Sequence, residues 1–168
     1  DSSPTITDTA ISRNRDCQKG GGVYMDNSTP TLTNVTVSYN ENNHLGGGLY
    51  LSRSDPELIN LRVTGNSAQA GGGIYLETSA PTFQNAVITI NTGLVEGGGL
   101  YLVGSAPRLV GATIASNLAG AGAGLFCESS SPVLENSIVY GNHLADDEGA
   151  DSGEPEQVFL KGASAPSF

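Results

Sequence analysis

A period of 25 or 26 residues runs through this 168-residue chain and limits its fold more than any other feature. Prolines recur at positions 4, 30, 56, 81, 107 and 132, and asparagines recur at positions 14, 40, 66, 91, 117 and 142. Glycine triplets at 20–22, 46–48, 71–73 and 97–99 follow the same period. Because three residue types share this period, we expect a chain built from stacked copies of one structural unit.

Each unit contains three short runs in which apolar and polar residues alternate, which is the pattern of β-strands. In the second unit these runs are 31–33, 35–38 and 49–51, with Pro, Asn and Gly between them as in tight turns. Strands of successive units pair in parallel at ~4.8 Å. The sequence therefore predicts an all-β fold, a right-handed parallel β-helix of about six coils with three strands each, forming one domain over residues 1–168.

The repeat also assigns side chains to columns that run along the stack. One inward apolar column from the first strand is Ile6, Leu32, Leu58, Phe83, Leu109 and Leu134. Asparagine amides can stack in register at a turn, each bonding to the next coil. We therefore expect two asparagine ladders, one from Asn14 to Asn142 and one from Asp8 to Asn136 that Gly111 interrupts.

The motifs inside the repeat resemble those of a known family. The segment 63–68, Val-Thr-Gly-Asn-Ser-Ala, followed by 71–75, Gly-Gly-Gly-Ile-Tyr, is similar to the paired Phe-x-x-Asn and Gly-Gly-Ala-Ile motifs of chlamydial polymorphic outer-membrane protein repeats. This chain has Val or Ile where that family favours Phe, and a third Gly. The resemblance implies a secreted adhesive β-helix similar to autotransporter passengers. The wider pectin-lyase-like superfamily shares the architecture and includes polysaccharide lyases and hydrolases, so fold alone leaves catalysis open.

The charge balance excludes some classes of partner. The chain has 7 Lys and Arg against 17 Asp and Glu, a net charge of −10, whereas nucleic acids and anionic lipids attract clustered basic residues. It has no apolar run near the roughly 18 residues of a membrane span, so no membrane insertion is expected. Cys17 and Cys127 fall four coils apart and cannot pair with each other. Cys17 is then a free thiol or forms a bond between chains.

When the repeats are aligned, the acidic and basic residues that could act in catalysis are scattered over different columns and coils. Glu57 and Arg108 share a column but lie two coils apart, and no column carries adjacent carboxylates. We therefore expect a protein without catalytic residues or cofactors, with a calcium-dependent polysaccharide lyase or a glycan-binding domain as the alternative. An insertion at 143–157 adds about eight residues and holds six acids between 146 and 156. This acidic loop is either a solvated loop or a Ca²⁺ site.

A column of aromatic residues follows the glycine triplets. Its rings alternate with inward residues and should therefore face outward as a stacked, exposed strip. The stacking either stabilises the ladder alone or makes a docking strip for glycans or for another copy of the protein. The six members of this aromatic ladder are Tyr24, Tyr50, Tyr75, Tyr101, Phe126 and Phe159.

The two ends of the chain fall at the same phase of the repeat, around Pro4 and Pro166, and neither carries an amphipathic cap. Uncapped end coils would expose unpaired backbone groups. Two explanations fit such ends: the chain is a fragment of a longer β-helix, or the last coil of one molecule pairs with the first coil of the next. For the second, we expect head-to-tail contact, with Pro4, Ile6 and Cys17 at one end and Val158 and Phe168 at the other. The predicted function is that of an extracellular or cell-surface structural or adhesive protein. Its expected partners are other copies of itself, head-to-tail in filaments or side by side, and glycans.

Overall fold

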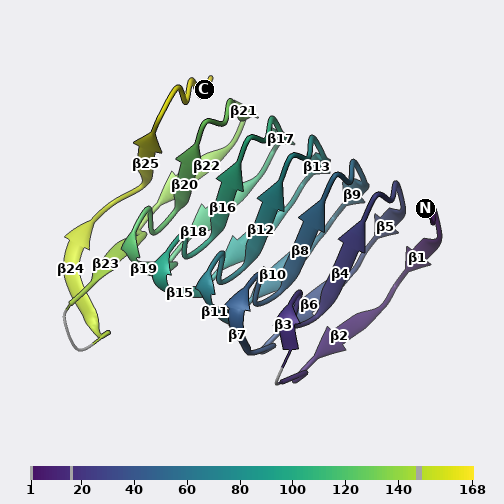
Figure 1. The fold of residues 1–168 in the computed structure, drawn as a ribbon, viewed down its shortest axis with the longest axis horizontal. Coiled ribbons are helices and arrows are strands. Elements are labelled where there is room, and N and C mark those ends of the chain that lie inside the picture. Colours follow the sequence, from purple (N-terminus) through teal and green to yellow (C-terminus); the bar gives the residue numbers. More distant parts are fainter. Residues whose placement is uncertain (1, 16, 147–148) are drawn as a thin grey trace.

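The computed structural model describes residues 2–15, 17–146 and 149–168, with Cys17 described by its backbone alone. The chain winds into a stack of coils whose strands form long sheets running along the stack (Figure 1). Four sheets, which we call A to D in chain order, surround one interior. The predicted parallel β-helix is confirmed, and each strand of coils two to five lies between its copies in the coils before and after.

The strands of sheets A and B carry the first two runs predicted for each unit. Sheet A consists of β1 (Thr5–Thr7), β5 (Thr31–Thr33), β9 (Glu57–Ile59), β13 (Thr82–Gln84), β17 (Arg108–Val110) and β21 (Val133–Glu135). Sheet B consists of β2 (Ala10–Ser12), β6 (Thr36–Ser38), β10 (Arg62–Thr64), β14 (Val87–Thr89), β18 (Thr113–Ala115) and β22 (Ile138–Tyr140).

Sheet D carries the third predicted run, and sheet C is an addition to the prediction. Sheet C consists of β3 (Cys17–Lys19), β7 (Asn42–Leu45), β11 (Ser67–Ala70), β15 (Thr92–Glu96), β19 (Leu118–Ala121), β23 (His143–Ala145) and β24 (Asp151–Pro155). Sheet D consists of β4 (Val23–Asp26), β8 (Leu49–Ser52), β12 (Ile74–Glu77), β16 (Leu100–Val103), β20 (Leu125–Glu128) and β25 (Val158–Lys161). The sequence predicts turns for the segments of sheet C, because they lack an alternating apolar pattern. They pair because the neighbouring coils supply backbone partners at the right spacing.

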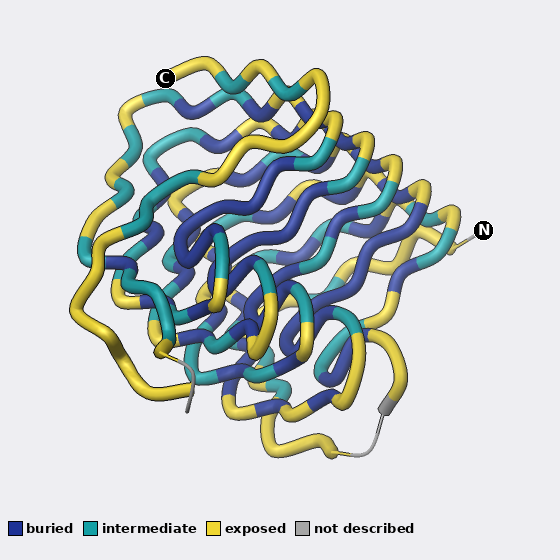
Figure 2. Tube along the Cα trace, turned by 60° about the vertical axis from the view of Figure 1, so that its left-hand side comes forward, coloured by how far each residue is buried: buried dark blue, intermediate teal, exposed yellow. Residues whose placement is uncertain are grey.

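The register places equivalent residues of successive coils opposite one another. Ile74 lies opposite Leu49 on one side and Leu100 on the other, and Tyr75 lies between Tyr50 and Tyr101. The inward columns are buried in the middle coils, where Leu32, Leu58, Phe83 and Leu109 have no exposed surface (Figure 2). The inward residues of the end coils, including Ile6 and Val158, are only partly buried.

Both asparagine ladders form. In the inner ladder, the Asn66 side-chain oxygen accepts hydrogen bonds from the backbone and side-chain nitrogens of Asn40, both at 2.9 Å. The outer ladder lies at a turn where the backbone is left-handed, with φ of 55° at Asn34 and 52° at Asn60. Asparagine tolerates this conformation better than other non-glycine residues, and Gly111 in the same column has φ of 64°. Gly111 therefore keeps the left-handed turn of this column but has no side-chain amide for the ladder.

The insertion at 143–157 forms a hairpin on sheet C. β24 runs antiparallel to β23, with His143 opposite Pro155 and Ala145 opposite Asp151, and every other pairing between the described strands is parallel. Residues 147 and 148 of the predicted acidic loop lie outside the described residues. Because β24 covers the edge of sheet C, the prediction of two uncapped ends is wrong at this corner of the C-terminal end.

Candidate functional site

The aromatic ladder is present as one continuous stack along sheet D. The centroid distances between successive rings are 5.5, 5.2, 4.9, 4.6 and 4.9 Å from Tyr24 to Phe159. The interplanar angles lie between 3° and 20°. The predicted stacking is therefore confirmed, and each inner ring uses both faces to contact its neighbours.

The predicted exposure of this ladder is wrong for three of its middle rings, whereas Tyr75 is half-buried. Tyr50, Phe126 and Tyr101 are 0%, 1% and 6% exposed, whereas the terminal rings of Tyr24 and Phe159 are 52% and 36% exposed. The glycine turns, which we define as the triplet segments between sheets C and D, lie close to the backbone end of the aromatic column. A Cβ atom added to Gly97 would lie 2.7 Å from the Cβ of Tyr101. The glycines therefore allow this close approach, while the neighbouring rings cover the two faces of Tyr101.

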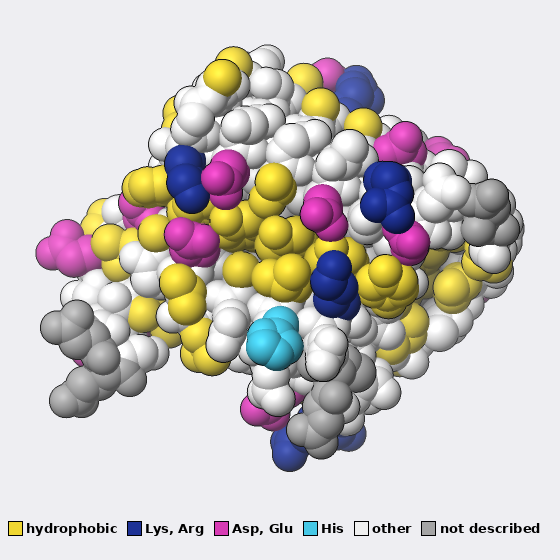
Figure 3. All heavy atoms as spheres, in the orientation of Figure 1, with side chains coloured by type: hydrophobic (Ala, Val, Ile, Leu, Met, Phe, Trp, Pro, Cys, Tyr) yellow, Lys and Arg dark blue, Asp and Glu magenta, His cyan; other side chains and the backbone are white. Residues whose placement is uncertain are grey.

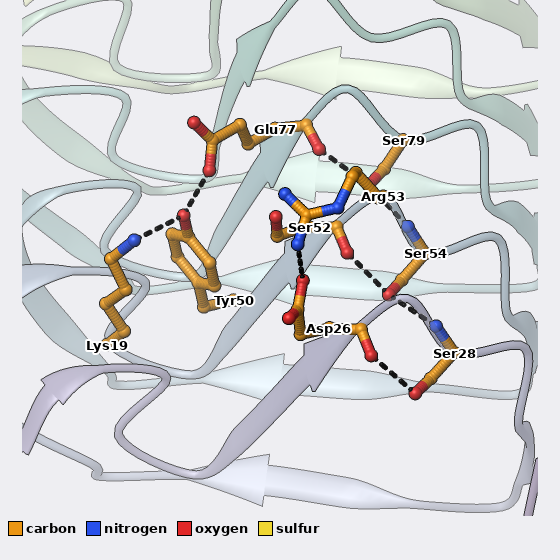
Figure 4. A network of polar contacts seen from close by, with 9 residues as sticks. All are labelled: Lys19, Asp26, Ser28, Tyr50, Ser52, Arg53, Ser54, Glu77 and Ser79. Atoms are coloured by element: carbon orange, nitrogen blue, oxygen red, sulfur yellow. Dashed lines mark hydrogen bonds and ion pairs between the residues drawn. The ribbon is translucent and has the colours of Figure 1, made fainter. Parts of the chain in front are cut away.

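Charged side chains complete the cover over Tyr50 (Figure 4). The Lys19 ammonium donates to the Tyr50 hydroxyl at 2.9 Å and lies 4.6 Å from the ring centroid. The Tyr50 hydroxyl donates to the Glu77 carboxylate. Burial, and then the hydrogen bond to Glu77, raise the pKa of Tyr50 well above its usual value because both disfavour the phenolate.

A second group of the same kind surrounds Tyr101. Its hydroxyl donates to the Glu128 carboxylate at 3.0 Å, and Lys161 pairs with the same carboxylate at 3.1 Å. Burial, followed by this hydrogen bond, raises the pKa of Tyr101. The pKa of Tyr75 is raised to about 12, mainly by burial. The hydrogen bonds from Lys161 and Tyr101 lower the pKa of Glu128.

This arrangement limits what the ladder can bind. On the face of sheet D shown in Figure 3, a band of hydrophobic side chains is crossed by acidic and basic side chains. Three ion pairs, Arg53 with Asp26, Lys161 with Glu128 and Arg108 with Glu135, form on the molecular surface. A sugar ring that stacks on an aromatic side chain needs a free aromatic face. In this ladder only the outer faces of Tyr24 and Phe159 lack an aromatic neighbour.

Each end of the stack has an apolar hollow. The N-terminal hollow has a volume of about 150 Å³, and the C-terminal hollow has a volume of about 400 Å³. Of the residues predicted to make end-to-end contact, Pro4 and Ile6 line the first hollow and Val158 and Phe168 line the second. The Cys17 side chain, also predicted there, lies outside the described residues. Tyr24 lines the N-terminal hollow as well, a role that its place in the aromatic column did not indicate.

The candidate catalytic and metal-binding residues do not converge. Glu57 accepts a hydrogen bond from Gln84, whereas Arg108 forms its ion pair with Glu135 at 2.7 Å. In the insertion, Asp151 pairs with His143 at 2.9 Å. Within the described part of the chain, no group of three or more His, Cys, Asp or Glu residues could hold a metal ion.

Cys127 lies in the inward column predicted for it. It is fully buried, and burial raises the pKa of its thiol to about 12. A thiol with this pKa stays protonated at neutral pH and is a poor nucleophile. Cys127 therefore serves as a small apolar core residue.

The described residues contain no helix long and apolar enough to span a membrane.

Comparison with known proteins places this fold in a family. Neither a curated protein nor a solved structure matches the chain significantly. The family model described as the right-handed β-helix region matches residues 1–119, which is more than half of the chain. Together with the stacked parallel coils, this match shows that the chain belongs to the right-handed β-helix family.

Proposed function

We propose that this protein is a non-catalytic structural or adhesive module, working outside the cell or at its surface, that associates with a second copy of itself through its N-terminal end. The observation that carries the proposal is the N-terminal face, which we define as the outer edges of β1, β2, β3 and β4. Within the described residues, these four strands pair on one side only, and the inward residues beside them are partly buried. Faces of this kind in solenoid proteins require a cap or a partner.

The chemistry of the N-terminal face supports a β-strand partner. Ile6, Ile11 and Val23 pack against the core but remain partly exposed, and Tyr24 presents its ring at 52% exposure. The four strands at this end each pair on one side only. A partner that supplies both strand edges and an apolar surface would bury these side chains and pair these backbone groups.

A second N-terminal face fits better than a C-terminal face. At the C-terminal end, β24 covers sheet C, and Ser167 pairs with Val133 on sheet A. A second copy that pairs along sheets A and C would have to displace these segments, whereas β22 and β25 pair on one side only among the described strands. Two N-terminal faces can instead meet about a two-fold axis, which gives a closed dimer with the same contacts on both copies.

The carboxyl groups support a non-catalytic role. A general acid in glycoside cleavage needs a raised pKa. Among the described carboxyl groups, the pKa values of Glu128 and Asp151 are shifted in the opposite direction, by Lys161 and by His143 respectively. Glu128 is held as an anion by its ion pair with Lys161, and Asp151 by its hydrogen bond with His143.

Location outside the cell and a role in adhesion are supported by the resemblance of the repeats to secreted adhesive proteins. Treatment of intact producing cells with a protease tests this location. The protein should be lost from intact cells while a cytoplasmic marker survives. Protection of the protein in intact cells would contradict the proposed location.

A glycan-binding or polysaccharide-cleaving role is the second candidate. It is favoured by a hollow of about 410 Å³ lined by Gln18, Lys19, His44, Leu45 and Gln69, which combines hydrogen-bonding side chains with an apolar one. Incubation with pectate and alginate, followed by measurement of product release and of binding, tests it. Binding that is lost in His44→Ala would support this candidate over the structural one.

The dimer is tested by measuring molar mass by light scattering over a range of protein concentrations. We expect a shift from monomer to dimer with rising concentration. Tyr24→Glu should remain monomeric because it places a charge on the face, whereas Tyr39→Glu, at a position that is 62% exposed away from this face, should dimerise normally. A monomer at every concentration, or a Tyr24→Glu variant that still dimerises, would refute the proposal.

A further inference from the structure

The hydroxyl of Tyr50 is enclosed by side chains from three coils. Tyr50 lies on β8, has no exposed surface, and stacks between the rings of Tyr24 and Tyr75. Its hydroxyl lies between Lys19 of β3 and Glu77 of β12 (Figure 4). Neither burial nor ring stacking requires this hydroxyl, because Phe126 is 1% exposed and stacked on both faces in the same column without one. The hydroxyl of Tyr50 is therefore open to a chemical role.

Glu77 is placed to take the phenol proton of Tyr50. The hydroxyl donates directly to its carboxylate, and proton transfer to a base requires a hydrogen bond of this kind. Among the described tyrosines of the ladder, Tyr50 and Tyr101 donate to a carboxylate. At Tyr101 the acceptor is Glu128, whose pKa is lowered by the hydrogen bonds from Lys161 and Tyr101, which makes it a weaker base. The same arrangement thus occurs twice, and at Tyr101 an ion pair weakens it.

The surroundings of Tyr50 require an electron and a proton to leave it together. Burial, and then the hydrogen bond to Glu77, raise the pKa of Tyr50, so the ring keeps its proton at neutral pH. The Lys19 ammonium, 4.6 Å from the ring centroid, disfavours a second positive charge on the ring. Lys19 also donates to the Tyr50 oxygen at 2.9 Å, and an oxygen that has lost its hydrogen can still accept this bond.

The aromatic ladder connects the enclosed ring to the outer face of sheet D. Tyr75 is half-buried and Tyr24 is 52% exposed, and their ring centroids lie 5.2 and 5.5 Å from that of Tyr50. Stacked rings at such distances can exchange an electron without forming a bond. An oxidant in solution can therefore oxidise Tyr50 through a neighbouring ring that it can reach.

We propose that Tyr50 is a redox site, which stores one oxidising equivalent that a diffusible one-electron oxidant delivers to the outer face of sheet D. The oxidant gains one electron from Tyr75 or Tyr24, and that ring regains one electron from Tyr50. The O–H bond of Tyr50 breaks, and its proton goes to the Glu77 carboxylate. The products are a neutral phenoxyl radical at Tyr50, a protonated Glu77 and the reduced oxidant. Because Tyr50 has no exposed surface, this radical is kept from coupling with a second radical.

The test uses light-generated ruthenium(III) tris-bipyridine as the one-electron oxidant and a cobalt(III) ammine complex as the final electron acceptor. All samples carry Tyr101→Phe, so that Tyr50 is the remaining described ladder tyrosine that donates to a carboxylate. Electron paramagnetic resonance should show a neutral tyrosyl radical that outlives the radicals of Tyr39 and Tyr140, which are 62% and 75% exposed. Adding Tyr50→Phe should remove the long-lived signal, whereas adding Tyr39→Phe should leave it unchanged.

Two variants test the proton acceptor and the route of the electron. Glu77→Gln keeps an oxygen that accepts the hydrogen bond but removes the base, so the long-lived signal should be lost. The matched change Glu57→Gln, on sheet A, should retain the signal. Tyr24→Phe combined with Tyr75→Phe keeps the stacking but replaces both neighbours by a ring that is harder to oxidise, so the yield of the Tyr50 radical should fall.

Lys19→Met gives a measurement that a purely structural role of Tyr50 would not change. A hydrogen bond to a phenoxyl oxygen lowers the gx value of the radical, so loss of the Lys19 bond should raise gx. The proposal is refuted if the Tyr101→Phe protein forms no long-lived radical. It is also refuted if Tyr50→Phe or Glu77→Gln, each with a native circular dichroism spectrum, retains the signal in full. Phe126 shows that this column accepts phenylalanine, so Tyr50→Phe should fold.

Discussion

Asn66 shows how one side chain connects three consecutive coils. Its oxygen accepts two hydrogen bonds from Asn40, and its amide group donates to the Val37 carbonyl and to Asn91, each at 3.0 Å. The side chain is 1% exposed, so water cannot replace these bonds. Asn60 in the outer ladder makes similar contacts with Asn34 and Asn85, but these lie in solvent.

We therefore expect the two ladders to differ in their contribution to stability. Asn66→Ala leaves the buried donors of Asn40 without an acceptor and should lower the free energy of unfolding by roughly 3 kcal/mol. Asn60→Gly keeps the left-handed turn and should change it by less than about 1 kcal/mol. Urea denaturation followed by circular dichroism measures both values. Equal losses of unfolding free energy in the two variants would show that burial does not determine how much each ladder contributes to stability.

The glycine turn is the element that connects sheet C to the aromatic column of sheet D. Its first glycine has a left-handed backbone, with φ of 64° at Gly97, and approaches the next aromatic residue. Gly104 has a similar φ of 53°, but the nearest atom to an added Cβ there is 4.0 Å away. Gly97 and Gly104 both adopt a left-handed backbone, but only Gly104 has room for an added Cβ atom.

Alanine at these two positions separates conformation from packing. Gly104→Ala should cost about 1–2 kcal/mol of unfolding free energy, because alanine disfavours the left-handed region. Gly97→Ala should cost about 1–3 kcal/mol more, because its methyl group would force the turn away from Tyr101. Thermal or urea unfolding gives the difference. A Gly97→Ala variant as stable as Gly104→Ala would mean that the turn does not pack on the ring.

The columns of the repeat could be predicted because the coils stack in register, which brings residues one repeat apart in the sequence into contact. The inward residues, the asparagine ladders and the ring stacking followed from this alone. The burial of Tyr50 and Tyr101 did not, because it also involves charged side chains of other strands, Lys19 and Glu77 at Tyr50 and Glu128 at Tyr101. The strands of sheet C were missed for a related reason: segments such as Ser67–Ala70 pair through their backbone, and their side chains carry no strand pattern.

At the scale of the whole molecule, the two ends of the solenoid have different chemistry. In a repeat protein each coil is stabilised by its two neighbours, so an end coil lacks half of these contacts. At the C-terminal end of the described stack, β24 covers the outer edge of β23 in sheet C. At the N-terminal end, Ile6, Ile11 and Val23 remain partly exposed. The sequence showed the matching phase of the two ends but not this asymmetry, which arises from the fold of the insertion.

The orientation of the dimer tests this account most directly, and double electron–electron resonance between spin labels measures it. One label is placed at Ser28, beside the N-terminal hollow, or at Ser152 on β24, in a Cys17→Ser background. We predict a short distance between the two Ser28 labels of a dimer and no short distance between two Ser152 labels. A short distance found only between Ser28 of one copy and Ser152 of another, in mixed samples, would show head-to-tail association and contradict the account.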